Sequence, residues 1–282
     1  MNVIAKLNVM LKYLLLIISF LFYNLSHSQS IVNTEKLFTT NDEGLGASAE
    51  LSGSSISGNA SVLLMEYSLN FSYKNEDHYL RFLSGGETIY EDNDEVSNSL
   101  FTQLRYNYFI NEKSRFYSFT QIQSNAILLL ERRLLLGAGF RRNIIDIKKD
   151  TSSRYELDIS AGVMQEQELL KTPPEFNIID GQESRNYTRA IFSLVGIIDI
   201  QDKFTIVNTT YLQQYVMNFN DFRLLNETNV MVKINEWLSI GLDLEYRFDS
   251  DPPMGINKVT SMEEFILKNK DFNSNLGLIF NF

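Results

Sequence analysis

Most of the chain beyond residue 43 alternates between apolar and polar residues with a period of two. From Met65 to Lys74, every odd-numbered residue is apolar or aromatic and every even-numbered residue is polar or charged. The same alternation recurs at residues 104–108, 155–163, 240–248 and 275–282. Successive side chains of a β-strand point to opposite faces, so each segment predicts a strand with one apolar and one polar face.

The length of these runs separates two kinds of β-protein. The alternating segments cover about 11 to 16 residues, whereas strands of globular proteins usually have about 5 to 6 and tilted strands that cross an outer membrane need about 9 to 11. We therefore predict an all-β fold, a transmembrane antiparallel up-and-down β-barrel of about 12 strands. The strands are expected at residues 44–54, 58–74, 78–90, 97–110, 114–128, 132–147, 153–168, 185–200, 203–217, 221–235, 237–249 and 270–282.

The connections between these strands support a barrel. Every second connection is short, and the two longest, at residues 169–184 and 250–269, fall on the opposite side and contain all four prolines. Short periplasmic turns and longer outer loops are typical of outer-membrane barrels. Aromatic residues collect at the strand ends and predict two interfacial girdles, the outer one including Tyr187 and Tyr215.

The N-terminus predicts an exported protein. Residues 1–28 resemble a signal peptide, with Lys6 and Lys12 before an apolar run of eleven residues and a Ser26-His27-Ser28 cleavage site. An N-terminal anchor helix is the alternative. We expect a short periplasmic segment at residues 29–43 and the barrel at residues 44–282, exported through the general secretory pathway to the outer membrane of a Gram-negative bacterium.

Composition excludes several classes of function. The chain contains no cysteine, which rules out disulfides, thiol nucleophiles and cysteine metal sites. A net charge of −10 argues against a nucleic-acid partner. We expect no cofactor and no metal.

Three segments resemble a known family. They are residues 104–108 (LRYNY), residues 133–140 (RLLLGAGF) and the loop at residues 249–256 (DSDPPMGI), after a first hairpin rich in glycine and serine. Together they resemble the uncharacterised family of salt-induced outer-membrane proteins. The resemblance implies an outer-membrane β-barrel but brings no activity or catalytic residues, and the long stretch 259–270 departs from the family pattern.

The C-terminus is similar to the signal that the barrel-assembly machinery recognises. Apolar residues at every second position end on an aromatic residue: Leu276, Leu278, Phe280 and Phe282. We therefore expect that machinery, periplasmic chaperones and outer-membrane lipid as partners. The oligomeric state stays open.

The polar face of the strands contains the candidate functional residues. In the predicted register, eight charged side chains point into the lumen: Glu66, Arg105, Arg141, Glu156, Asp158, Asp243, Glu245 and Arg247. Charged rings of this kind set the ion preference of a pore. The same charges could instead pair as a structural network in a plugged barrel. The first hypothesis is therefore a narrow pore or an envelope-structure protein.

Two alternatives from other classes stay open. His78 could serve an outer-membrane lipid hydrolase, although its predicted place at the periplasmic end is far from the outer leaflet. The long loops could bind a surface partner through unusually apolar residues: Leu169, Leu170, Phe176, Met254 and Ile256. The acidic stretches 91–95 and 249–251 could hold Ca²⁺, but the spacing of a calcium loop is missing.

Overall fold

The computed structural model describes residues 43–56, 61–92, 94–126, 128–150, 153–171, 176–178, 183–201, 203–235, 238–265 and 267–280. Twelve long strands form one antiparallel sheet, in which each strand pairs with its neighbours along the chain. Their bounds are β1 (Gly44–Ile56), β2 (Val62–Asn75), β3 (His78–Glu91), β4 (Asp94–Asn111), β5 (Ser114–Asn125), β6 (Leu130–Asp150), β7 (Ser153–Leu170), β9 (Ser184–Ile200), β10 (Phe204–Tyr215), β11 (Phe222–Lys233), β12 (Leu238–Asp249) and β15 (Lys270–Phe280).

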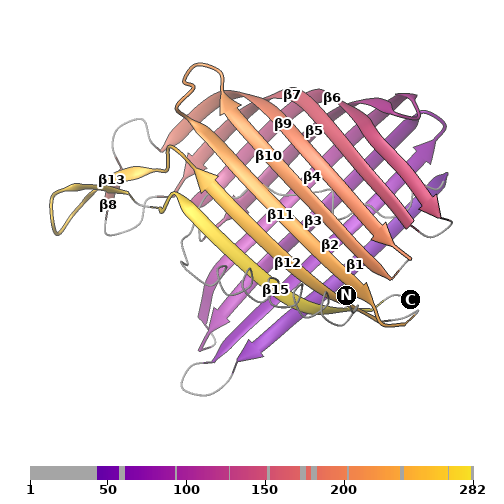
Figure 1. Cartoon of the computed structure of the whole chain (residues 1–282). Coiled ribbons are helices and arrows are strands. Elements are labelled where there is room, and N and C mark those ends of the chain that lie inside the picture. Colours follow the sequence, from indigo (N-terminus) through magenta and orange to yellow (C-terminus); the bar gives the residue numbers. More distant parts are fainter. Residues whose placement is uncertain are drawn as a thin grey trace, which may run out of the picture.

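The sheet curls on itself. Figure 1 shows the first strands passing behind β10, β11, β12 and β15, with β1 and β15 as the two ends of the strand order. The architecture is an antiparallel up-and-down β-barrel of twelve strands, as predicted, and each predicted strand end lies within four residues of the observed one.

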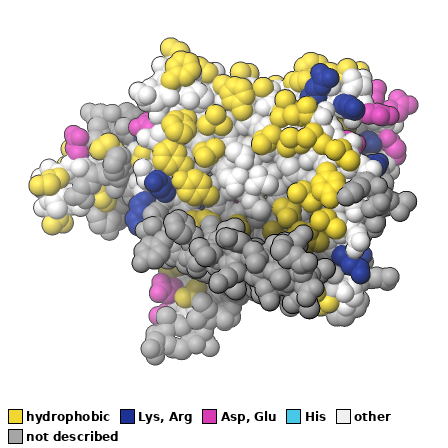
Figure 2. Space-filling model, in the orientation of Figure 1, with side chains coloured by type: hydrophobic (Ala, Val, Ile, Leu, Met, Phe, Trp, Pro, Cys, Tyr) yellow, Lys and Arg dark blue, Asp and Glu magenta, His cyan; other side chains and the backbone are white. Residues whose placement is uncertain are grey.

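The alternation along the strands separates an apolar outer face from a polar inner face. On β2, Leu69 and Phe71 are exposed on the outside, whereas Asn70 and Ser72 between them are buried on the inside. Figure 2 shows hydrophobic side chains spread over the outer surface. In the described part of the chain, no helix is long and apolar enough to cross a membrane.

Aromatic side chains line the turn end of the outer face. Phe71, Tyr73, Tyr108 and Phe116 are all exposed there.

The prediction was wrong for two members of the opposite girdle. Tyr187 is buried and packs edge-on against Tyr215, with 5.0 Å between ring centroids. Both lie at odd-numbered positions, the inward face of β9 and β10, because the alternation continues without a bulge to the end of these strands.

The two longest loops join in a small second sheet that the sequence analysis missed. It contains β8 (Phe176–Ile178), β13 (Met254–Asn257) and β14 (Glu263–Phe265), in the order β14-β13-β8. Figure 1 shows it projecting from one side of the barrel. Segments about 80 residues apart in sequence therefore meet outside the barrel wall.

Several predictions concern residues outside those described. They are the signal peptide at residues 1–28, nearly all of the segment 29–43, and Phe282. Of the C-terminal signal, the other three residues belong to β15, where Leu276, Leu278 and Phe280 pair with Leu242, Ile240 and Leu238 of β12.

Candidate functional site: the charged inner face

The eight predicted lumen residues all share the inner face of the barrel wall. Arg105 and Arg141 are buried there, 7% and 2% exposed. Glu66 pairs with Glu87 across β2 and β3, at positions whose neighbours Met65 and Tyr67 are exposed outside. The others occupy the same inward phase on β7 and β12: Glu156, Asp158, Asp243, Glu245 and Arg247.

The structure divides these residues between several contacts rather than one ring. Asp158 accepts a hydrogen bond from Asn143 at 2.9 Å and lies 3.5 Å from Arg115 and 4.0 Å from Arg141. Elsewhere on the same inner face, on β12, Arg247 contacts Glu245 at 2.5 Å. Asp243 accepts a hydrogen bond from Asn229. The predicted residues are therefore paired locally, each with close neighbours on the wall.

A larger cluster lies at the loop ends of the strands. We call it the loop-side network, and its members are Arg133, Glu166, Glu168, Arg189, Asp221, Arg223 and Asp249. Three guanidinium groups meet four carboxylates, and every one of these side chains is at most 3% exposed.

Arg223 is the centre of this network. Its Nη1 lies 2.7 Å from Glu166 Oε1 and 3.1 Å from Glu168 Oε1, and its Nε lies 3.0 Å from Asp249 Oδ2. The contact with Asp249 joins neighbouring strands. The contacts with Glu166 and Glu168 reach from β11 to β7, past β9 and β10. Arg223 therefore crosses part of the lumen instead of lying flat along the wall.

Two further arginines complete the pairing of the carboxylates. Arg133 Nε lies 3.0 Å from Glu166 Oε1 and 2.6 Å from Glu168 Oε1. Arg189 donates to Glu166 at 2.7 Å and to Asp221 at 2.8 Å. Each buried charge thus has an opposite charge within hydrogen-bond distance, which offsets the high cost of removing charges from water.

Tyr187 places an aromatic face against the same arginines. The Arg189 guanidinium carbon lies 4.3 Å from the Tyr187 ring centroid and the Arg223 carbon 5.9 Å from it. Such cation–π contacts add to the pairing in a desolvated site. The inward turn of Tyr187 is therefore explained by its place beneath the network.

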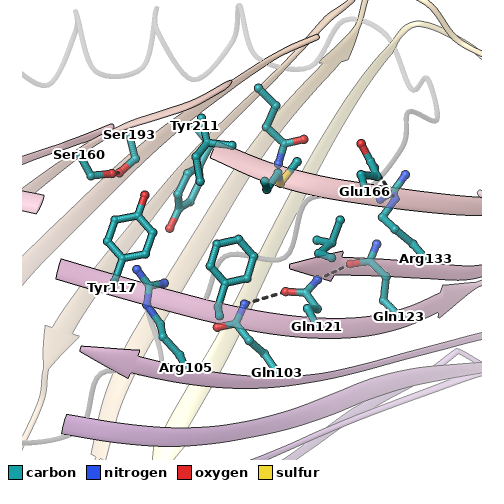
Figure 3. Close-up of a pocket in the computed structure, with 15 residues that line it drawn as sticks. Gln103, Arg105, Tyr117, Gln121, Gln123, Arg133, Ser160, Glu166, Ser193 and Tyr211 are labelled. Atoms are coloured by element: carbon teal, nitrogen blue, oxygen red, sulfur yellow. Dashed lines mark hydrogen bonds and ion pairs between the residues drawn. The ribbon is translucent and has the colours of Figure 1, made fainter. Parts of the chain in front are cut away.

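A cavity of about 60 Å³ lies next to the network on the inner face. Its lining is mixed, with a row of amides beside an apolar cluster of Tyr117, Met164 and Ile191. Figure 3 shows Gln103, Gln121 and Gln123 in a row that leads toward Arg133 and Glu166. Gln103 donates to Gln121 at 2.7 Å, and Gln121 donates in turn to Gln123. A chain of hydrogen-bonded amides thus extends along the wall from the network.

His78 lies away from the lumen. It is exposed at the turn end of β3, where its Nδ1 shares a hydrogen bond of 2.6 Å with the Tyr106 hydroxyl and its ring stacks with Tyr106. A hydrolase triad needs a carboxylate at that nitrogen. The geometry therefore favours a place in the aromatic girdle over a catalytic one.

The acidic loop segments form no metal site in the part of the chain that the structure describes. No group of three histidine, aspartate or glutamate side chains there is arranged to hold an ion. Asp249 instead pairs with Arg223. Partial burial raises the pKa of the neighbouring Asp251 carboxyl, against the opposing effect of Arg185.

The loop-side network was not predicted, although its signal is present in the sequence. Glu166 and Glu168 continue the same inward phase as Glu156 and Asp158, and Arg223 is the second residue of the strand whose Glu227 is buried inside. Extending the alternation to the loop ends of the predicted strands would have assigned these residues inward. Their meeting across the lumen depends on the curvature of the sheet.

Comparisons with known proteins identify the family of the chain. A family model described as "Protein of unknown function, DUF481" matches residues 49–282. No curated protein matches the chain. Two solved structures of similar shape are "NanC porin structure in rhombohedral crystal form" and "KdgM porin", each 9% identical to this chain and each covering 84% of it. The match covers 99% and 98% of their chains, with TM-scores of 0.44 and 0.39. The family resemblance noted in the sequence is confirmed, and the chain belongs to the DUF481 family of proteins of unknown function.

Proposed function

We propose that the protein is an integral outer-membrane β-barrel that forms a narrow, polar, porin-like pore, with the loop-side network as its constriction. The observation that carries the proposal is the opposite chemistry of the two faces of the wall. The outer face exposes rows of apolar side chains, while the inner face carries paired charges along the length of the strands. Lipid matches the first face and water the second.

The inner face supports a path for small ions rather than for large solutes. Arg223 reaches across part of the lumen at the loop end. Beside it, the cavity holds about 60 Å³, enough for water molecules. A narrow path along this wall would select ions by the charges on it. The competing interpretation is a lumen that the network closes completely, which makes the protein a structural component of the envelope.

Single-channel recording from the refolded mature chain in planar bilayers tests the proposal. We expect small, stable, ion-selective conductance steps. Arg105→Gln removes a positive charge beside the cavity and should increase the relative permeability to cations, whereas Asp243→Asn should increase that to anions. The readout is the reversal potential in a KCl gradient.

Lys203→Gln is the matched control for charge. Lys203 is exposed in the turn between β9 and β10, so its neutralisation changes the net charge without changing the inner face. A correctly folded barrel that stays electrically silent would contradict the pore and favour the closed envelope protein. Selectivity that shifts equally in Lys203→Gln would show that the inner face does not set it.

The location and the partners belong to the same proposal. We infer residence in the outer membrane from the apolar outer face, delivery by the general secretory pathway, and insertion by the barrel-assembly machinery and periplasmic chaperones. Fractionation of cells that express the full chain tests the location, and Phe282→Ala, with loss of the terminal aromatic residue, should slow insertion. Equal insertion rates would argue against the C-terminal signal.

A second function, binding at the cell surface, is favoured by the small sheet of the long loops. β8, β13 and β14 hold the two loops together outside the wall, and exposed apolar side chains lie on it and beside it: Ile256, Val259 and Met262. Exposed apolar groups on an ordered loop are typical of binding surfaces. Replacing residues 258–262 with a glycine–serine linker should abolish such binding while conductance persists.

A further inference from the structure

Four polar side chains interrupt the apolar outer face at the middle of β10 and β11. We call them the outward polar patch: Asn208, Thr210, Asn226 and Thr228. They point outward because the intervening Thr209, Leu225 and Glu227 are buried on the inner face. Along both strands the patch lies between apolar outward residues, with Ile206 and Val230 toward the turns and Leu212 and Leu224 toward the loops.

The surface view agrees with this position. Figure 2 shows a white area at the centre of the face formed by β9 to β12, between two bands of yellow hydrophobic side chains. In the proposed membrane orientation, this area lies at the depth of the lipid tails. Polar groups at that depth are costly unless they find hydrogen-bond partners.

The patch satisfies only part of its own hydrogen-bonding capacity. Asn208 donates to Thr228 at 2.7 Å and Asn226 donates to Thr210 at 2.7 Å, with two longer contacts of 3.4 Å between the amides. Each threonine hydroxyl thus accepts a hydrogen bond, and within the described residues neither finds an acceptor for its own hydrogen. Two donors and the remaining lone pairs of the amide oxygens therefore face outward.

Another outward hydroxyl donates its hydrogen to an acceptor within the protein. On the facing part of the wall, Ser84 of β3 donates to the backbone carbonyl of Phe101 at 3.2 Å. Its hydrogen is satisfied within its own sheet, so lipid can cover it at little cost. Within the described residues, the two threonine hydroxyls of the outward polar patch have no such acceptor.

The surface beside the patch allows close approach. Gly196 of β9 pairs with Asn208 on the same outward face, and a Cβ atom added there would meet only one side-chain atom, at 3.9 Å. Small residues at such a place let two membrane-embedded walls come together. The patch and Gly196 together form a flat polar area within the apolar belt.

We propose that this area is an interface with a second copy of the same chain, related by a two-fold axis along the membrane normal. All copies insert in the same orientation, so the outward polar patch lies at the same depth in each. A two-fold axis then brings patch against patch, and threonine hydroxyls of one copy face amide oxygens of the other. A head-to-tail arrangement would instead set the patch against the apolar wall of its neighbour, leaving the donors unsatisfied.

Disulfide cross-linking tests the interface, because the chain contains no cysteine. The variant is Thr228→Cys and the matched control is Thr102→Cys, a mid-strand outward threonine on β4. After oxidation of outer-membrane fractions, we expect a disulfide-linked dimer for Thr228→Cys, severalfold more abundant than for Thr102→Cys. Equal yields would overturn the proposal, as would a cross-link to a different protein.

A second variant separates the interface from folding. The double substitution Asn208→Leu with Asn226→Leu suits a lipid-facing wall, so the barrel should fold as before. Dimer affinity, measured in nanodiscs, should fall by roughly tenfold or more, since several membrane-buried hydrogen bonds of modest strength are lost together. A dimer that tolerates both substitutions contradicts the proposal.

The inference rests on the outer-membrane location proposed above, and the experiment separates the two. Absence of the chain from the outer-membrane fraction overturns both proposals. A monomer inside that fraction overturns only the interface.

Discussion

The two ends of the inner wall use the same ion pairs in different surroundings. At the loop end, Arg223 and its carboxylate partners are at most 2% exposed. At the turn end, Arg154 pairs with Glu156 and lies 3.5 Å from Asp146, but 42% of its side chain is exposed. The difference is burial, and burial decides how much the loss of one partner costs.

The loop-side network behaves as a unit. Its charged groups are buried away from water and stabilise one another. A single carboxylate, that of Glu166, contacts Arg133, Arg189 and Arg223. Removing one member leaves others buried with fewer partners. At the turn end, Arg154 and Glu156 can each replace their ion pair by contacts with water at little cost. The loop end is therefore rigid and the turn end adaptable.

The largest expected effect comes from Arg223→Met, which removes the guanidinium at the centre of the network. We expect a loss of about 3–5 kcal/mol in the free energy of unfolding, because up to three carboxylates stay buried with fewer partners. Urea unfolding of the barrel in lipid vesicles, followed by circular dichroism, measures it. A loss below about 1 kcal/mol would mean that water reaches the network and that the two ends do not differ.

The sequence predicted the wall far better than it predicted the network. Several long strands alternate with a period of two over five to ten residues, so their existence and their inward faces could be predicted from local pattern. The contact of Arg223 with Glu166 and Glu168 joins strands that are three apart in the sheet order. Such contacts depend on sheet curvature, which the alternation of residues does not encode.

Short elements escaped prediction for a related reason. β8 and β14 have three residues each, too few to display a period, and each of them pairs with β13, which lies between them. Tyr187 was misplaced because an aromatic residue at a strand end has two possible explanations, the girdle and the lumen. The phase of β9 decides between them.

A close packing contact in the middle of β7 leads to a prediction of intermediate size. Gly162 pairs with Gly139 across β7 and β6, and a Cβ at residue 162 would lie 2.5 Å from the carbonyl oxygen of Ala138 and 2.9 Å from the Tyr117 hydroxyl. Because the backbone cannot yield as a side chain can, Gly162→Ala should cost about 1–3 kcal/mol. The same urea titration measures it.

Gly196→Ala is the matched control for that substitution. Gly196 also lies mid-strand, but an added Cβ there would meet its nearest neighbour at 3.9 Å, an ordinary contact. In monomeric barrels, the stability should change little. If both glycine variants lose the same stability, the cost comes from the backbone of the strands and not from packing against the inner wall.

The smallest effect is expected for Arg154→Met at the turn end. Its ion pairs are open to solvent, so the free energy of unfolding should change by no more than about 0.5 kcal/mol, and added salt, which screens exposed charges, should make that difference smaller still. The substitution matches Arg223→Met in the residues exchanged and differs from it in burial. A cost above about 2 kcal/mol would mean that the turn end excludes water as well. The inner wall would then be one continuous buried network from end to end, and the pore proposed here would have no wet entrance on the periplasmic side.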